Sequence, residues 1–121
     1  MPTVNRLTPP SEDLSACIAA CEAARRACEN CAAEDARDGD PMMAACILIN
    51  LDCAAICSAT LGALARGSVH HGDFCALCAH VCTACAEECG KHDHEHCIRC
   101  REACKLCAEA CKQHAGERHA M

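Results

Sequence analysis

Small and apolar side chains recur along most of this chain with the three- to four-residue spacing of helices. Four such stretches cover about residues 11–37, 41–66, 73–89 and 93–115. The positions between the apolar ones hold mainly Ala, Glu, Arg, Lys and Leu, which favour helices. β-Branched residues are few and no stretch alternates with a period of two, so strands are not expected. The pattern predicts four helices.

The breaks between these stretches carry residues that typically begin and end helices. Ser11 is a suitable N-cap for the first helix, and Asp40 followed by Pro41 is a suitable start for the second. Gly90 is expected to end the third helix and Asp93 to cap the fourth. Because the connections are short, successive helices are expected to run antiparallel.

These boundaries predict the organisation of the whole chain. We expect an all-α fold, an antiparallel up-down-up-down four-helix bundle over residues 11–115. A tail of residues 1–10 precedes it and a tail of residues 116–121 follows it.

Cysteine marks one face of every predicted helix. In the third and fourth helices it recurs with spacings of 3, 4, 3 and 4, and the first two helices follow the same spacing with Ala24 and Asn50 at two of the steps. These are heptad a and d positions, which face the axis of a bundle, and we expect Asn50 to be a hydrogen-bonded polar residue there rather than a ligand. The 17 cysteines are Cys17, Cys21, Cys28, Cys31, Cys46, Cys53, Cys57, Cys75, Cys78, Cys82, Cys85, Cys89, Cys97, Cys100, Cys104, Cys107 and Cys111.

Composition shows that these cysteines must form much of the interior. Without its 25 Ala and 17 Cys the chain has only 21 apolar side chains, and it contains no Trp or Tyr. Cysteine makes up 17 of 121 residues, a share above the roughly 8–10% that signals a cysteine scaffold. The bundle is therefore expected to have a Cys-lined core.

Charge and the N-terminal sequence limit the expected partners and the expected cellular location. A net charge of −6 does not favour nucleic acid or an anionic membrane surface as a partner. No uninterrupted apolar run approaches the roughly 18 residues of a membrane span, and residues 1–10 do not resemble a secretory signal. We therefore expect a cytoplasmic protein with reduced thiols, and an odd number of cysteines cannot all pair within one chain.

A thiol-lined tube suits a soft metal ion. Cu(I) is soft and univalent, and about one ion per thiolate would neutralise the buried charge. Zinc prefers closed sites of four ligands, so the same thiols would hold only about four zinc ions. Multiple Cu(I) ions per chain are the expected ligand.

Three other interpretations remain. The chain could be a zinc or general thiol-metal buffer, or its thiols could act only as small hydrophobic groups. A redox or copper-transfer enzyme is a further alternative, but no His, Asp or Glu cluster stands isolated inside the predicted tube, so we expect no enzyme.

We call the row of cysteines on each predicted helix a stripe. The two ends of the tube differ when each stripe is extended by one further spacing of three or four residues. At the end near the first and third loops the extension reaches soft ligands, and we expect copper to enter there. His96 lies in the same region but is expected to point off the stripe, and His80 lies on another face. The candidate ligands of this mouth are Met42, Met43, His92 and His94, beside Glu34 or Asp35 and Asp93.

The opposite end is expected to be a hydrophobic stopper. Leu64 and Phe74 lie near it. The extended stripes reach Leu14, Leu61, His71 and His114.

On the four cysteine stripes, over about residues 11–115, the chain resembles the copper storage proteins, which are Cys-lined four-helix bundles of bacteria. The resemblance implies reversible storage of many Cu(I) ions along the axis, cytosolic members without an export signal, and passage of copper through an end lined by Met or His. It also implies a homotetramer of bundles, for which the outer Leu48, Leu51 and Leu77 are candidate interface residues. Ala24 and Asn50 depart from complete stripes and would lower the capacity. We expect the bundle to be helical before copper binds.

Overall fold

The computed structural model describes residues 12–117, with side chains from Leu14 onward. The predicted N-cap Ser11 and most of both predicted tails lie outside the described residues. Within them the chain forms helices only, so the all-α prediction is confirmed. The elements are α2 (Glu12–Asp38), the short 3-10 helix η1 (Pro41–Met43), α3 (Ala44–Ala65), α4 (His71–Cys89) and α5 (Glu95–Lys112).

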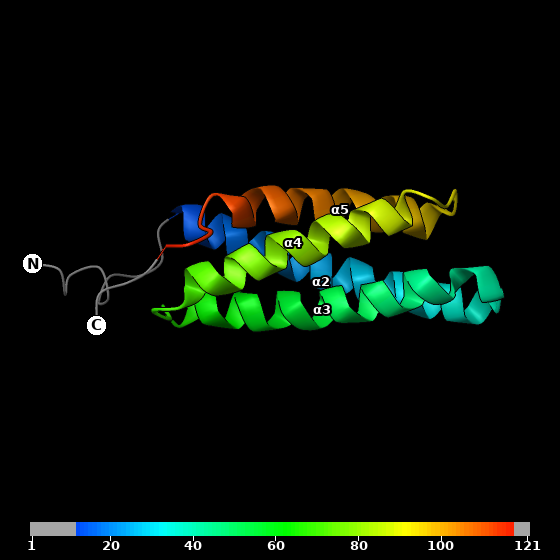
Figure 1. Cartoon of the computed structure of the whole chain (residues 1–121), viewed down its shortest axis with the longest axis horizontal. Helices are drawn as coiled ribbons and strands as arrows, with labels where there is room; N and C mark the ends of the chain where they lie inside the picture. Colours follow the sequence, from blue (N-terminus) through cyan, green and yellow to red (C-terminus); the bar gives the residue numbers. More distant parts are fainter. Residues whose placement is uncertain (1–11, 118–121) are drawn as a thin grey trace, which may run out of the picture.

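The helices form an elongated bundle in which each helix lies beside its neighbour in the sequence (Figure 1). α2 packs against α3, α3 against α4, α4 against α5, and α5 returns to α2, which confirms the up-down-up-down order. We call the end with residues 38–43 and 90–94 the loop end, since the first and third connections lie there. The other is the terminal end, where residues 66–70 and the ends of the described chain lie (Figure 1).

Two glycines allow the turns that follow α2 and α3. Gly39 and Gly67 have φ values of +71° and +64°, in the left-handed region that glycine adopts at low cost. After Gly39, the Asp40 side chain accepts a hydrogen bond of 2.9 Å from the Met42 N–H, and Pro41 takes the first position of η1. The predicted start at Asp40 and Pro41 is confirmed.

The boundaries of α4 and α5 differ from the prediction. Asp93 is not the N-cap of α5: that position belongs to His94, whose backbone is extended and whose side chain makes no capping bond. α4 begins at His71, two residues before the predicted start. α5 ends at Lys112 rather than near Ala115, because the chain then turns toward the start of α4.

The core contains almost no large side chains. Alanines that are at most 6% exposed flank the cysteines, and such small side chains let neighbouring helices approach closely.

By length and average hydropathy alone, the stretch Pro41–Ala65 could cross a membrane, although core helices often meet the same criterion. Its Cys46, Asn50 and Cys53 are wholly buried against the other helices.

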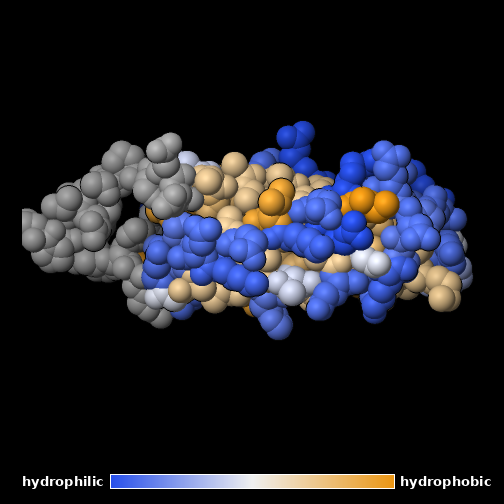
Figure 2. Space-filling model, turned by 90° about the horizontal axis from the view of Figure 1, so that it is seen from above, coloured by the Kyte–Doolittle hydropathy of each residue, from blue (hydrophilic) through white to orange (hydrophobic). Residues whose placement is uncertain are grey.

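The outer surface is mixed. Figure 2 shows hydrophilic side chains interspersed with apolar ones along one face. Among the side chains that the structure describes, the large apolar ones that remain exposed are Met42, Leu48, Leu51, Leu77, Ile98 and Leu106. Leu48, Leu51 and Leu77 therefore lie on the outside, as expected.

Candidate metal centre

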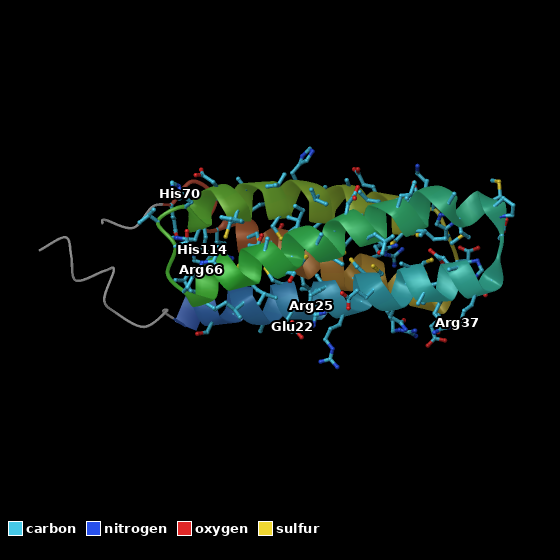
Figure 3. The ribbon with its side chains drawn as sticks, turned by 90° about the horizontal axis from the view of Figure 1, so that it is seen from below. Glu22, Arg25, Arg37, Arg66, His70 and His114 are labelled. Carbon is cyan, nitrogen blue, oxygen red and sulfur yellow. The ribbon has the colours of Figure 1, made fainter. Side chains whose placement is uncertain are left out.

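All 17 cysteines point into the bundle. Each is 0% exposed except Cys89, at 1%. All are free thiols, so none forms a disulfide. Sulfur atoms appear between the ribbons along the length of the bundle in Figure 3.

The thiols form a continuous series rather than separate sites. In the middle of the tube, the Sγ atoms of Cys28 and Cys104 are 3.5 Å apart, and those of Cys53 and Cys82 are 3.6 Å apart. The Cys57 Sγ lies 3.7 Å from the same Cys82 Sγ, so one sulfur of α4 contacts two sulfurs of α3. Metal–sulfur bonds of about 2.3 Å place two sulfurs about 3.8–4.0 Å apart at tetrahedral or trigonal angles. The observed sulfur–sulfur distances are close to those expected when one metal ion binds two neighbouring thiolates.

Several groups of thiols converge closely enough for one ion each. In each group the ligand atoms all lie within 4.8 Å of one another. Some cysteines belong to more than one group, as a bridging thiolate would require. The groups include Cys21, Cys78, Cys107 and Cys111; Cys28, Cys53, Cys85 and Cys104; Cys57, Cys78, Cys82 and Cys107; Cys31, Asp35, Cys46 and Cys97; and Cys17, Cys75 and Cys111.

Asn50 fills its step of the tube as a hydrogen-bonded residue. Its Oδ1 accepts hydrogen bonds from the Cys100 and Cys85 thiols at 2.9 and 3.3 Å. Its Nδ2 donates to the Cys46 carbonyl oxygen at 2.8 Å and lies 3.3 Å from the Cys46 Sγ. Ala24, at the other incomplete step, is also wholly buried. The expectation that Asn50 is a hydrogen-bonded polar residue is confirmed.

Neighbouring thiols control one another's protonation. Hydrogen bonds from Cys104 and Cys28 lower the pKa of Cys53, because they stabilise its thiolate. Hydrogen bonds with Cys100 and Cys28, followed by burial, raise the pKa of Cys104. A thiolate is therefore favoured only where neighbours stay protonated, and filling the tube with metal ions must release protons.

The last thiols at the loop end surround a buried carboxylate. Asp35 is 0% exposed, and its two oxygens lie 3.8 Å from the thiols of Cys31 and Cys97. His96 Nε2 lies 2.7 Å from Asp35 Oδ1 on the side nearer to solvent. Burial, followed by the negative charge of Asp35, raises the pKa of Cys97 to about 11. This end offers three kinds of donor, sulfur, oxygen and nitrogen, in one place.

The position of His96 differs from the prediction. It was expected to point off the stripe, but it binds Asp35 and its side chain is 12% exposed. The signal was available, since His96 lies four residues before Cys100 and therefore on the same side of the helix.

The four candidate mouth residues lie at different depths. Met43 is 2% exposed, whereas Met42 is 79% exposed and points away from the tube. His92 is half-buried and contacts Glu88 at 3.1 Å. His94 is exposed, stacks on His96 with ring centroids 5.2 Å apart, and lies 3.8 Å from Asp38.

The terminal end is less apolar than the expected stopper. Leu14 and Leu64 are buried there, as expected. His71 and His114 are also buried, and both contact the carboxylate of Glu117. Figure 3 shows His114 at this end of the bundle.

Similar proteins share both the sequence and the fold. The family model for copper storage proteins (Csp) matches residues 10–116. The cysteine-rich protein YhjQ of Bacillus subtilis is 41% identical over 81 residues, which cover 66% of this chain and 75% of YhjQ.

Two solved structures resemble the bundle closely. The Cu(I)-bound copper storage protein BsCsp3, of Bacillus subtilis, is 39% identical, with a TM-score of 0.83 over 87% of this chain and all of BsCsp3. A cytosolic copper storage protein of Streptomyces lividans with five coppers is 36% identical, with a TM-score of 0.77 over 92% of this chain and 94% of its own. Together with the buried thiols, these matches show that the chain belongs to the copper storage protein family.

Proposed function

We propose that this chain stores many Cu(I) ions on the thiolates that line its four-helix bundle and releases them reversibly. One observation carries the proposal: sulfur atoms 3.5 to 4.0 Å apart join thiols of all four helices, and groups of ligand atoms within 4.8 Å of one another extend to both ends of the tube. Two solved relatives that hold copper, one of them as Cu(I), have the same fold and 36–39% identity, which supports copper as the cargo.

Charge favours Cu(I) over zinc. The core holds 17 thiols and no Lys or Arg side chain among the buried residues that the structure describes. Thiolates in such a core need metal cations to balance them. One Cu(I) per thiolate leaves the tube near neutral, whereas about four zinc ions would balance only about eight of the 17 charges.

Copper enters and leaves at the loop end in this proposal. Met43, His92 and His94 line or border that end as soft or borderline ligands, and Asp35 with His96 leads to Cys31 and Cys97. A partly exposed imidazole beside a buried carboxylate provides a short path of donors from solvent to the first thiols.

The cellular setting follows from likeness. A Streptomyces relative is a cytosolic protein, and reduced thiols are stable in the cytoplasm, so we place the chain there. A homotetramer remains a proposal, with Leu48, Leu51 and Leu77 as its interface. Storage rather than catalysis is the proposed role, because the thiol tube is filled by packed side chains.

An anaerobic titration tests the storage function. Reduced protein is titrated with Cu(I) in competition with a chromogenic chelator of known affinity, and the bound copper is counted. We expect well over ten ions per chain to be withheld from the chelator. Saturation at about four or fewer would contradict storage and favour a zinc-like or structural role.

A further inference from the structure

A strap closes the terminal end of the bundle. We give this name to residues 113–117, which follow α5 and turn across the start of α4. The Gly72 N–H donates to the Glu117 carbonyl oxygen at 3.1 Å, and the Gly116 N–H donates to the Gly72 carbonyl oxygen at 3.1 Å. This reciprocal pair fixes the strap against α4.

Two glycines are required for this contact. A Cβ atom at Gly72 would overlap the backbone N and O atoms of Glu117. Gly116 has a φ of +83°, which side chains other than glycine rarely adopt. The path of the strap therefore depends on glycine at both positions, and this path determines where the Glu117 side chain lies.

The strap brings one carboxylate between two buried imidazoles. Glu117 Oε1 lies 2.9 Å from His71 Nε2 and 3.0 Å from His114 Nδ1. The histidine side chains are 2% and 9% exposed, and the Glu117 side chain is 47% exposed. Thus one carboxylate oxygen of the strap lies within 3.0 Å of a nitrogen of each imidazole, one from α4 and one from the strap.

We propose that His71, His114 and Glu117 form a site for one divalent ion of the zinc class, which fastens the strap to the bundle. The site is separate from the storage of Cu(I) on thiols. Two histidines and a glutamate are a recurrent ligand set for zinc, with bonds of about 2.0–2.2 Å. Tetrahedral angles at such bonds put neighbouring donor atoms about 3.3 Å apart, close to the separations of 2.9 and 3.0 Å seen here.

The surroundings of the three residues fit this donor set. His71 Nδ1 lies 3.3 Å from the Ser68 carbonyl oxygen, an outer partner of the kind that orients a metal-binding imidazole. Burial opposes ionisation of Glu117, but hydrogen bonds from His71 and His114 outweigh it and hold its pKa below the usual range. The carboxylate is thus available as an anionic ligand. Its partial exposure leaves access for water at a fourth position.

Donor chemistry separates this site from the thiol tube. Thiolates select Cu(I), whereas imidazole and carboxylate together suit zinc and similar divalent ions. Zinc would nevertheless bind empty thiols, so the test uses protein whose thiols are already filled with Cu(I). Copper and zinc are both counted for each chain.

The variant Glu117→Gln removes the anionic ligand with little change in shape. Copper-filled wild-type protein and variant are dialysed against Zn(II) with a weak chelator, and metal content is measured. We expect the variant to retain one zinc fewer per chain. Glu109→Gln is the matched control, since Glu109 is an exposed carboxylate on α5 whose ion-pair partner is Lys112 at 3.9 Å. It should retain as much zinc as the wild type.

Imidazole NMR signals give a second readout that does not depend on the thiols. Zn(II) should shift the signals of His71 and His114 in the wild-type protein and leave the exposed His80 unchanged. In Glu117→Gln the two shifts should be lost or need much more zinc. Equal zinc content in wild type and Glu117→Gln, or unmoved His71 and His114 signals, would overturn the proposal. A variant that lost one copper instead of one zinc would also overturn it, since the site would then hold cargo.

Discussion

The two ends of the thiol tube use the same groups in opposite order. At the loop end the carboxylate of Asp35 is wholly buried against thiols, and the imidazole of His96 lies on its solvent side. At the terminal end the imidazoles of His71 and His114 are buried, and the carboxylate of Glu117 lies outside them.

This difference fits the copper entrance that we propose at the loop end and the strap that closes the terminal end. The Asp35 oxygens lie 3.8 Å from two thiols, so a cation there is already beside the storage ligands. The Glu117 oxygen is held by two imidazoles and by a strap whose backbone is bonded to Gly72. The order of the groups, rather than their identity, distinguishes the ends.

Met43 is a large apolar side chain that is buried at the loop end. It is 2% exposed, so Met43→Ala should lower the free energy of unfolding by about 2–5 kcal/mol. Met42→Ala is the control, since Met42 is 79% exposed and its loss should change stability by less than about 0.5 kcal/mol. Chemical denaturation of the copper-free proteins measures both. Equal effects would mean that Met43 does not pack into the loop end as described.

At the terminal end the strap depends on Gly72. Gly72→Ala should displace the Glu117 backbone and lower the free energy of unfolding by about 1–3 kcal/mol. Gly62→Ala is a matched change in α3, where the new Cβ would meet only the flexible end of Arg66 at 3.0 Å. It should be neutral or stabilising by up to about 1 kcal/mol. A Gly72→Ala protein as stable as Gly62→Ala would show that the strap is not held as described.

Copper uptake should depend on the carboxylate at one end only. Asp35→Asn keeps the shape but removes a charge worth about 1–4 kcal/mol to a cation at 4 Å, depending on solvent screening. We expect uptake of Cu(I) to slow by about tenfold, the equivalent of about 1.4 kcal/mol. Stopped-flow mixing of Cu(I) with reduced protein measures the rate. Glu117→Gln should load copper at the wild-type rate, and a slowing in both variants would contradict a single entrance.

The smallest expected effect is on the pH dependence of stability that the Cys97 thiol causes. Burial and Asp35 raise the pKa of Cys97 from 9.0 to about 11, so the folded copper-free protein keeps a proton there that the unfolded chain loses. Its free energy of unfolding should therefore fall as pH rises from 9 to 11. Asp35→Asn removes the negative charge, lowers the pKa of Cys97 and should make this fall shallower. Denaturation at a series of pH values measures it, and an unchanged slope would contradict the role given to Asp35.

Copper-filled protein provides the control for this pH dependence. Thiolates bound to Cu(I) have already lost their protons, so the same rise in pH should leave stability nearly unchanged. A similar loss of stability with and without copper would show that groups other than the thiols titrate.

The cysteine spacing alone predicted most of the fold and the tube. Residues three and four apart lie on one face of any α-helix, so the stripes had to face the axis once four helices packed together. Asp40 and Pro41 also act locally, through a side-chain bond and a fixed φ angle, and their position was predictable.

The groups at the two ends of the tube depend on contacts between segments that are distant in sequence. Met42 and Met43 are adjacent in sequence, but the turn at Gly39 and η1 buries one and exposes the other. His96 and Glu117 gained their roles from residues 61 and 46 positions away, Asp35 and His71. A helix repeats its face every few residues by its own geometry, whereas a chain leaving a helix is directed by the contacts it meets. The sequence therefore determined the thiol tube, and packing between distant segments determined how each end of it is closed.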